Sequence, residues 1–148
     1  MPQYMKGDMW TVLGKVQWFC ITTNAIVKNN GALVMGAGIA RQMRDRYPGI
    51  DLACGEAVRD STNSEGVYGF IRPRLGLGLF QVKRHFKGSA DLELIQRSTK
   101  QLHDYAAKCP GLTFALNFPG IGNGKLDYAQ VKPIVDQLPD NVQIWTFN

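Results

Sequence analysis

The sequence predicts a layered α/β domain in which helices cover both faces of a central sheet. Strand-like and helix-like segments alternate along the whole chain, and no repeat, low-complexity run or long linker separates them. Strands that alternate with helices imply a sheet that is covered on both faces. Because 148 residues with 45% hydrophobic residues suffice for one core, we expect a single domain over residues 1–148.

The predicted strands are short runs that are rich in β-branched and aromatic residues. They cover residues 16–22, 67–71, 77–82, 112–117 and 142–147. A further short strand is expected before Asp8. The first of these runs contains Cys20, which we interpret as a core residue because free cysteine behaves as a small hydrophobic side chain.

Apolar residues at helical spacing predict four helices, and helix-breaking residues set their ends. The predicted helices cover residues 38–47, 50–59, 91–108 and 127–138. The break between the first two lies at Pro48 and Gly49.

The third helix has the clearest pattern, with apolar residues at spacings of three and four, and either Ser89 or Asp91 is available as its N-cap. In the last helix, Pro133 must lie early or bend the helix.

The charge balance favours anionic partners, because 17 basic residues stand against 12 acidic ones. Part of the excess lies at Arg72, Arg74, Lys83, Arg84 and Lys87. A solvated basic face is the plainer interpretation of this group. The common duplex-binding motifs are absent, so general nucleic-acid binding is the weakest alternative.

We expect a cytoplasmic chain without a membrane segment, because the apolar runs are too short to cross a bilayer and residues 1–10 do not resemble a secretion signal. The three cysteines have neither the number nor the spacing of a disulfide framework or a zinc site. No cluster of Cys, His, Asp and Glu has ligand spacing, so no metal and no cofactor are expected.

Two glycine-rich segments follow predicted strands and precede predicted helices. We call residues 35–40 (Met-Gly-Ala-Gly-Ile-Ala) the first glycine loop and residues 118–124 (Phe-Pro-Gly-Ile-Gly-Asn-Gly) the second glycine loop. Glycine lets backbone amides approach a phosphate closely, and helix N-termini attract anions. One such loop alone is usually a tight turn, whereas two together favour a diphosphate site.

Two familiar nucleotide motifs do not fit these loops. The first loop lacks the third glycine position of the dinucleotide fingerprint, and Gly124-Lys125-Leu126 lacks the Ser or Thr of a P-loop. The sequence therefore favours neither a Rossmann dehydrogenase nor an NTPase.

Four segments in order along the chain carry a resemblance to a known family: Lys6-Gly7-Asp8-Met9, Thr22-Thr23-Asn24, the first glycine loop, and Gly120-Ile121-Gly122-Asn123-Gly124 followed by Leu126-Asp127. They resemble the macro domains, most closely the branch with the terminal ADP-ribose protein glycohydrolase and the DNA ADP-ribosyl glycohydrolase antitoxins. The resemblance spans nearly the whole chain. It implies a three-layer α/β/α fold around a mixed sheet, with ADP-ribose in a cleft across its crest.

The resemblance also implies a set of ligand-binding residues. Asp8 would accept a hydrogen bond from the adenine amine, beside the backbone N–H of Met9, although Asp8 as a turn or cap residue stays an alternative. Asn24 would lie near the distal ribose, although it could be an ordinary turn residue. The diphosphate would lie against Gly36, Ala37, Gly38, Ile39, Gly120, Ile121, Gly122, Asn123 and Gly124.

For catalysis, the resemblance implies Lys83 and Asp127. Lys83 would attack the anomeric carbon if its pKa were lowered by desolvation or by neighbouring Arg84, and Asp127 would act as general acid or base. The alternatives are an electrostatic clamp for Lys83 and an N-cap for Asp127. His85 could supply a proton in a phosphatase-type reaction if the strand continued that far.

The expected function is an ADP-ribose-binding hydrolase, acting as a monomer, that removes ADP-ribose from protein carboxylates or nucleic acid. Its partner is ADP-ribose or an ADP-ribosylated protein or nucleic acid. An ADP-ribose 1″-phosphate phosphatase and a non-catalytic ADP-ribose reader remain alternatives. A reader would not need both Lys83 and Asp127.

Overall fold

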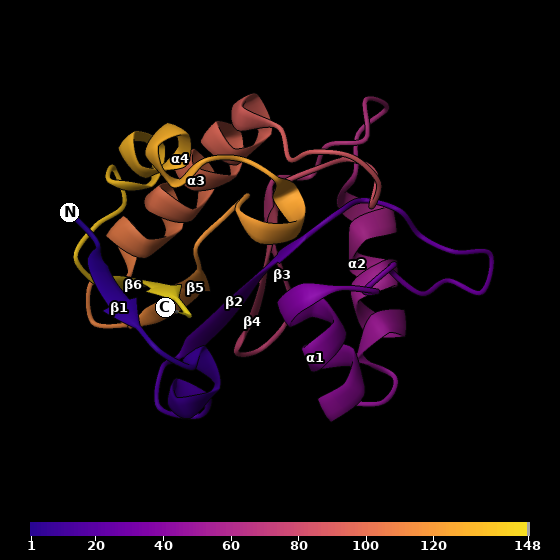
Figure 1. Ribbon diagram of the computed structural model, residues 1–148. Coiled ribbons are helices and arrows are strands. Elements are labelled where there is room, and N and C mark those ends of the chain that lie inside the picture. The colour runs from indigo at the N-terminus through magenta and orange to yellow at the C-terminus, as the bar shows by residue number, and fades with distance from the viewer. Residues whose placement is uncertain (148) are drawn as a thin grey trace.

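The computed structural model describes residues 1–147, and its centre is a sheet of six strands (Figure 1). The strands are β1 (Gln3–Lys6), β2 (Trp18–Thr23), β3 (Phe70–Arg74), β4 (Leu77–Gln81), β5 (Phe114–Asn117) and β6 (Val142–Thr146), in the spatial order β1-β6-β5-β2-β4-β3. Every neighbouring pair is parallel except β3 with β4, which is antiparallel. The predicted mixed sheet is therefore confirmed.

Four helices form the two outer layers: α1 (Gly38–Arg46), α2 (Ile50–Ser61), α3 (Leu92–Lys108) and α4 (Tyr128–Val135). Figure 1 shows α3 and α4 on one side of the sheet and α1 and α2 on the other. Two short 3₁₀ helices, η1 (Met9–Val12) and η2 (Gly122–Gly124), complete the fold. The three-layer α/β/α arrangement is the predicted one.

Strand β2 shows why helices cover both faces of the sheet. Its side chains alternate, so that Phe19 and Ile21 pack in the cluster with α1 and α2, whereas Trp18 and Cys20 pack in the cluster with α3 and α4. Cys20 is completely buried, as expected. A strand that is apolar on both faces requires cover on both.

The helix ends follow local chemistry. Asp91 is the N-cap of α3, and its carboxylate accepts hydrogen bonds from the N–H groups of Glu93 at 2.9 Å and Leu94 at 3.4 Å. Helix α4 ends at Val135, three residues before the predicted end. Pro133 lies inside it and cannot donate a backbone hydrogen bond, and the chain continues to Leu138 in tighter turns.

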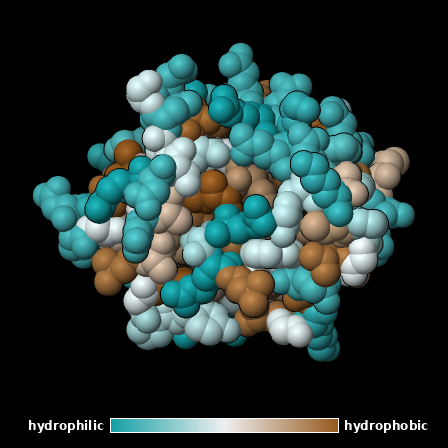
Figure 2. All heavy atoms as spheres, turned by 180° about the vertical axis from the view of Figure 1, so that it is seen from behind, coloured by the Kyte–Doolittle hydropathy of each residue, from teal (hydrophilic) through white to brown (hydrophobic). Residues whose placement is uncertain are grey.

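The surface contains both hydrophilic and hydrophobic residues (Figure 2). On the face seen in Figure 2, hydrophilic residues surround smaller groups of hydrophobic ones. Within residues 1–147, no helix is both long enough and apolar enough to span a membrane.

Candidate functional site

A cavity of about 620 Å³ lies at the carboxyl ends of β2, β4 and β5. Strands β2 and β5 are neighbours, but the next helices in the chain, α1 after β2 and α4 after β5, pack on opposite faces of the sheet. The two connections therefore diverge and leave a crevice between them. Open α/β sheets bind ligands at such points.

The two glycine loops form the opposite walls of this cavity. The predicted ligand-binding residues that line it are Asn24, Gly36, Ala37, Gly38, Ile39, Gly120, Ile121, Asn123 and Gly124. The predicted catalytic residue Lys83 lines it as well. The structure thus brings together segments that lie up to about a hundred residues apart in the sequence.

The loops approach each other at Gly38, the first residue of α1. Its φ of 57° lies in the left-handed region, and a Cβ atom at this position would lie 3.5 Å from the side-chain nitrogen of Asn123. Glycine is therefore favoured here by the left-handed backbone, whereas a Cβ atom would make only an ordinary van der Waals contact with Asn123. The N-terminal N–H groups of α1 begin at this point, which is a favourable place for an anion.

The floor of the cavity is fixed by a contact between the ends of β2 and β5. The side-chain oxygen of Asn117 accepts from the N–H of Thr22 at 3.0 Å, and the Asn117 side-chain nitrogen donates to the Thr22 hydroxyl at 2.8 Å. Both residues line the cavity. Two reciprocal hydrogen bonds hold the starts of the two connections at a fixed separation.

Asn24 also has a structural part in the site. Its side-chain nitrogen donates to the carbonyl of Val34 at 3.0 Å, and its side-chain oxygen accepts from the N–H of Ile26 at 3.0 Å. Asn24 therefore ties the chain after β2 to the segment that enters the first glycine loop. Asn24 is therefore a turn residue and also lines the cavity.

Lys83 follows the end of β4 and extends into the cavity. Its Nζ atom donates to the carbonyl oxygens of Gly88 at 3.2 Å and of Asn123 at 3.4 Å. Partial burial lowers the pKa of Lys83, and the nearby charge of Lys125 lowers it further. Of the two causes suggested from the sequence, desolvation is the larger one here, whereas Arg84 is not a cause of the lowered pKa.

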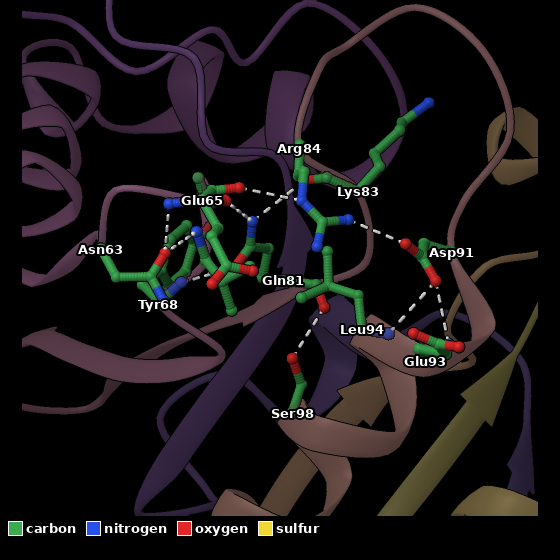
Figure 3. Close-up of polar contacts among 12 residues, drawn as sticks. Asn63, Glu65, Tyr68, Gln81, Lys83, Arg84, Asp91, Glu93, Leu94 and Ser98 are labelled. Atoms are coloured by element: carbon green, nitrogen blue, oxygen red, sulfur yellow. Dashed lines mark hydrogen bonds and ion pairs between the residues drawn. The ribbon is translucent and has the colours of Figure 1, made fainter.

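A buried amide next to Lys83 fixes the course of the chain at this point (Figure 3). The side-chain oxygen of Gln81 accepts from the N–H groups of Tyr68 at 2.8 Å and Gly69 at 3.0 Å. Its side-chain nitrogen donates to the carbonyls of Gly66 at 2.8 Å and Lys83 at 3.3 Å. Gln81 has no exposed surface, so these four bonds are shielded from water and hold the backbone of Lys83.

Arg84 does not line the cavity, and Figure 3 shows its side chain directed toward Asp91, whereas that of Lys83 extends in a different direction. Its Nη1 atom lies 2.8 Å from the carboxylate of Asp91, and its Nε atom donates to the carbonyl of Glu65 at 3.0 Å. This ion pair joins the two ends of the segment 84–91, from which Phe86, Lys87 and Gly88 line the cavity. Arg84 thus anchors one wall of the site, while Lys83 points into it.

Four predicted site residues do not line the cavity: Asp8, Met9, Gly122 and Asp127. Asp8 is the N-cap of η1, and its carboxylate accepts from the N–H of Trp10 at 3.0 Å. Asp127 is the N-cap of α4, and its N–H donates to the side-chain oxygen of Gln130 at 3.1 Å. Both aspartates therefore have the cap role that was considered as the alternative to a role in ligand binding or catalysis.

His85 does not lie on β4, which was the condition for its suggested phosphatase-type role. Strand β4 ends at Gln81, so it does not continue to His85. The ring nitrogen Nδ1 accepts from the N–H of Lys87 at 3.1 Å, and the ring lies against Phe86 with centroids 4.2 Å apart. His85 is exposed and does not line the cavity.

Sequence reasoning missed several residues of the site, notably Thr22, Asn117, Phe86, Lys87 and Lys125 as lining residues. The charged residues that line the cavity are all lysines, at positions 83, 87 and 125. The grouping of Lys83 with Lys87 in a basic stretch was a signal for part of this set. In the described part of the chain, no three His, Cys, Asp or Glu side chains gather as a metal site would need.

Comparisons with known proteins agree with this architecture. No family model and no curated protein matches the chain. Among solved structures, the macrodomain of Thermus aquaticus DarG matches with a TM-score of 0.73 at 22% identity, over 100% of this chain and 98% of that one. The macrodomain of Mycobacterium tuberculosis DarG matches with a TM-score of 0.70 at 25% identity, over 100% of this chain and 99% of that one.

A third structure, Thermosipho africanus DarTG in complex with ADP-ribose, matches with a TM-score of 0.71 at 20% identity. The match covers 97% of this chain and 41% of that one, so this chain corresponds to less than half of that protein. Together with the six-stranded mixed sheet and its two helical layers, these likenesses confirm that the chain has the macrodomain fold to which its sequence motifs point.

Proposed function

We propose that the chain binds ADP-ribose in the cavity between the two glycine loops and hydrolyses an ADP-ribosyl linkage there. One observation carries the proposal: a cavity walled by two glycine loops contains three lysines and no acidic residue in its lining. Such a cavity suits a diphosphate, which backbone amides, a helix N-terminus and ammonium groups all favour. A solved structure of the same fold is a complex with ADP-ribose.

In the proposed complex the diphosphate lies between the two loops, and the distal ribose lies toward Lys83. The adenine extends beyond the cavity toward Asp8 and Met9, at the carboxyl end of β1. The cavity of about 620 Å³ is of the size of typical small-molecule sites. The reactive end of the ligand is therefore the end that faces a lysine.

The proposed reaction begins with the uncharged amine of Lys83. As its nitrogen forms a bond to the anomeric carbon of the distal ribose, the bond to the leaving oxygen or base nitrogen breaks, and the leaving group takes the electron pair and a proton. Water then displaces the lysine, which releases ADP-ribose and restores the amine. The lowered pKa of Lys83 supports this role, because only the uncharged form has a lone pair.

Asp127 is proposed as the acid or base of this reaction. Its carboxylate lies at the N-terminus of α4 and outside the cavity lining, so it must reach the reacting centre once ligand is bound. Lys83 can attack without it, and water can carry the proton. The two residues therefore need separate tests.

A glycohydrolase is favoured over a phosphatase for a specific reason. The proton donor considered for the phosphatase, His85, is exposed and turned to its own loop. A non-catalytic reader needs no lysine with a lowered pKa beside the ligand. The wall that carries Lys83 thus points to cleavage of the glycosidic bond.

The deciding experiment incubates the purified chain with ADP-ribosylated protein, ADP-ribosylated DNA and ADP-ribose 1″-phosphate in parallel, with and without excess chelator. We expect release of ADP-ribose from one of the first two substrates, and calorimetry should show micromolar binding of ADP-ribose, about −8 kcal/mol. Turnover of the phosphate ester alone would favour the phosphatase. Binding without turnover would leave the reader.

Asp8→Asn is expected to weaken ADP-ribose binding about tenfold, roughly 1.4 kcal/mol, while the stability of the fold is retained. Asparagine keeps one side-chain oxygen for the cap to Trp10 but replaces the second acceptor with a donor, which cannot accept from the adenine amine. Calorimetry with ADP-ribose and with its hypoxanthine analogue measures the effect. Unchanged preference between the two ligands in Asp8→Asn would leave Asp8 as a cap only.

A further inference from the structure

Two consecutive threonines at the end of β2, Thr22 and Thr23, line the cavity. A hydroxyl group carries one proton that it can donate and lone pairs that can accept. Whether either hydroxyl can donate to a ligand therefore depends on the hydrogen bonds that it makes within the protein. The structure gives the two threonines different partners.

The hydroxyl of Thr22 keeps its proton available because of its contact with Asn117. The backbone N–H of Thr22 can only donate, so the Asn117 side-chain oxygen must face it, at 3.0 Å. The Asn117 side-chain nitrogen then faces the Thr22 hydroxyl at 2.8 Å, and an amide nitrogen cannot accept a proton. Asn117 is the only hydrogen-bond partner of this hydroxyl within residues 1–147. The Thr22 hydroxyl therefore accepts from Asn117 and can donate its own proton to a ligand.

The hydroxyl of Thr23 has already donated its proton. The Tyr68 hydroxyl donates its one proton to the backbone carbonyl of Asn24 at 2.6 Å. Thr23 is hydrogen-bonded to the same Tyr68 hydroxyl, which has no second proton, so Thr23 is the donor in that bond. Thr23 and Tyr68 are both buried. Of the two threonines, Thr22 is therefore the one that can donate into the cavity.

Thr22 lies on the cavity floor, at the level where the two glycine loops begin to diverge. It ends the exposed part of β2, and its partner Asn117 is the last residue of β5. The charged residues of the lining are lysines, so the cavity favours an anionic ligand. Diphosphate oxygens carry no proton at neutral pH and can only accept. They are therefore the ligand atoms that suit a hydroxyl with a free proton.

We propose that Thr22 is a ligand-binding residue whose hydroxyl, oriented by Asn117, donates a hydrogen bond to an anionic oxygen of the diphosphate. Asn117 is the positioning residue, because its amide offers the hydroxyl only a donor and leaves the Thr22 proton to the ligand. The pair makes the cavity floor selective for an oxygen without a proton. The inference deepens the proposed function and rests on it for the identity of the ligand, but the hydrogen bonds that orient Thr22 exist in the ligand-free protein.

Thr22→Val removes the donor and keeps the branched shape of the side chain. We expect it to bind both ADP-ribose and ADP about tenfold more weakly by calorimetry, because a hydrogen bond to a charged oxygen is lost. Thr22→Ser keeps the hydroxyl and should bind within about threefold of the parent chain. Loss of affinity for ADP-ribose alone would place the contact at the distal ribose and overturn the assignment to the diphosphate. Parental affinity for both ligands would overturn the proposal.

Thr23→Val is the matched control, since it makes the same substitution at the adjacent residue of the same cavity. It should lower the melting temperature, because it removes a buried hydrogen bond to Tyr68. Its affinity for ADP-ribose should stay within about twofold of the parental value, because its proton is not available to a ligand. An equal loss of affinity in Thr23→Val and Thr22→Val would mean that any change at the end of β2 disturbs the cavity, and the specific role of Thr22 would fall.

Asn117→Asp tests the orientation of the hydroxyl. The carboxylate still accepts from the N–H of Thr22, but it also accepts the Thr22 proton and so turns the lone pairs of the hydroxyl toward the ligand. Because the substitution adds a negative charge as well, its effect on ADP-ribose affinity is measured in the parent chain and in Thr22→Val. The charge acts in both backgrounds, whereas the reversed hydroxyl acts only in the parent chain.

We expect Asn117→Asp to weaken ADP-ribose binding at least about fivefold more in the parent chain than in Thr22→Val. Equal effects in the two backgrounds would show that Asn117 does not act through Thr22 and would overturn its positioning role. Failure of the parent chain to bind either ligand would reject the proposed function and this inference together. A parent chain that binds ADP-ribose no better than Thr22→Val does would reject the inference alone.

Discussion

Gly122→Glu is expected to abolish ADP-ribose binding. Gly122 lies between Ile121 and Asn123, which both line the cavity, and open space surrounds the position that its Cβ atom would take. The side chain of a glutamate therefore has space, although the φ of 65° strains the backbone, and it places a negative charge beside the proposed diphosphate. Repulsion between unit charges a few ångströms apart near a protein surface is worth several kcal/mol, so we expect binding at least about a hundredfold weaker by calorimetry.

Gly49→Glu is the matched control for this variant. Both glycines have a positive φ, 65° at Gly122 and 92° at Gly49, and neither has an atom within 4 Å of an added Cβ. Gly49 precedes α2, whereas the cavity lies at the other end of α1. Gly49→Glu should therefore destabilise the fold about as much as Gly122→Glu does, but it should bind ADP-ribose with the affinity of the parent chain. Equal affinity in Gly122→Glu and Gly49→Glu would place the diphosphate elsewhere.

The sequence was sufficient to predict the sheet and the position of the cavity. Strand β2 is recognisable because its apolar side chains serve both faces, and the end of α1 because Pro48 follows it. The second glycine loop directly follows β5 and contains η2, whereas the first glycine loop leads into α1 and is separated from the end of β2 by residues 24–34. Since parallel strands end at one edge of the sheet, local patterns alone brought the two loops together.

The partners of individual side chains could not be predicted in the same way. The bonds between Thr22 and Asn117, which are 95 residues apart, depend on β2 and β5 being neighbours. In the sequence, Gln81 is an ordinary polar residue at the end of a predicted strand. Its hydrogen bond with the N–H of Tyr68 depends on the tertiary structure. Lys125 gives no signal in the sequence that its backbone is left-handed, with a φ of 63°.

The two aspartates show a different limit. An aspartate before a helix suits both a cap and a catalytic acid, and the residue type does not separate the two. The structure places both Asp8 and Asp127 at caps and outside the cavity lining. Their roles toward ligand therefore stay predictions that only variants with an intact cap can test.

Lys83→Ala is expected to reduce turnover roughly a hundredfold or more, with ADP-ribose affinity within about tenfold of the parent. The amine is the proposed nucleophile, and the neighbouring contacts to Gly88 and Asn123 are carbonyls that cannot replace it. Steady-state kinetics and calorimetry separate the two effects. A raised KM with unchanged kcat would show uniform binding energy, and Lys83 would then be a phosphate clamp with water as the nucleophile.

Asp127→Ser separates the catalytic role of Asp127 from its cap, because serine is also a favoured N-cap and carries no carboxylate. If Asp127 activates the water that displaces Lys83, Asp127→Ser should slow product release, and a lysine adduct should accumulate on the peptide that contains Lys83, visible by mass spectrometry after denaturation. Asp127→Ala should show the same adduct and lose about 1 kcal/mol of folding stability in addition, because it removes the cap as well. Parental turnover in Asp127→Ser with destabilisation only in Asp127→Ala would assign Asp127 to α4 alone. Catalysis would then depend on Lys83 and water, which agrees with a cavity that has no acidic residue in its lining.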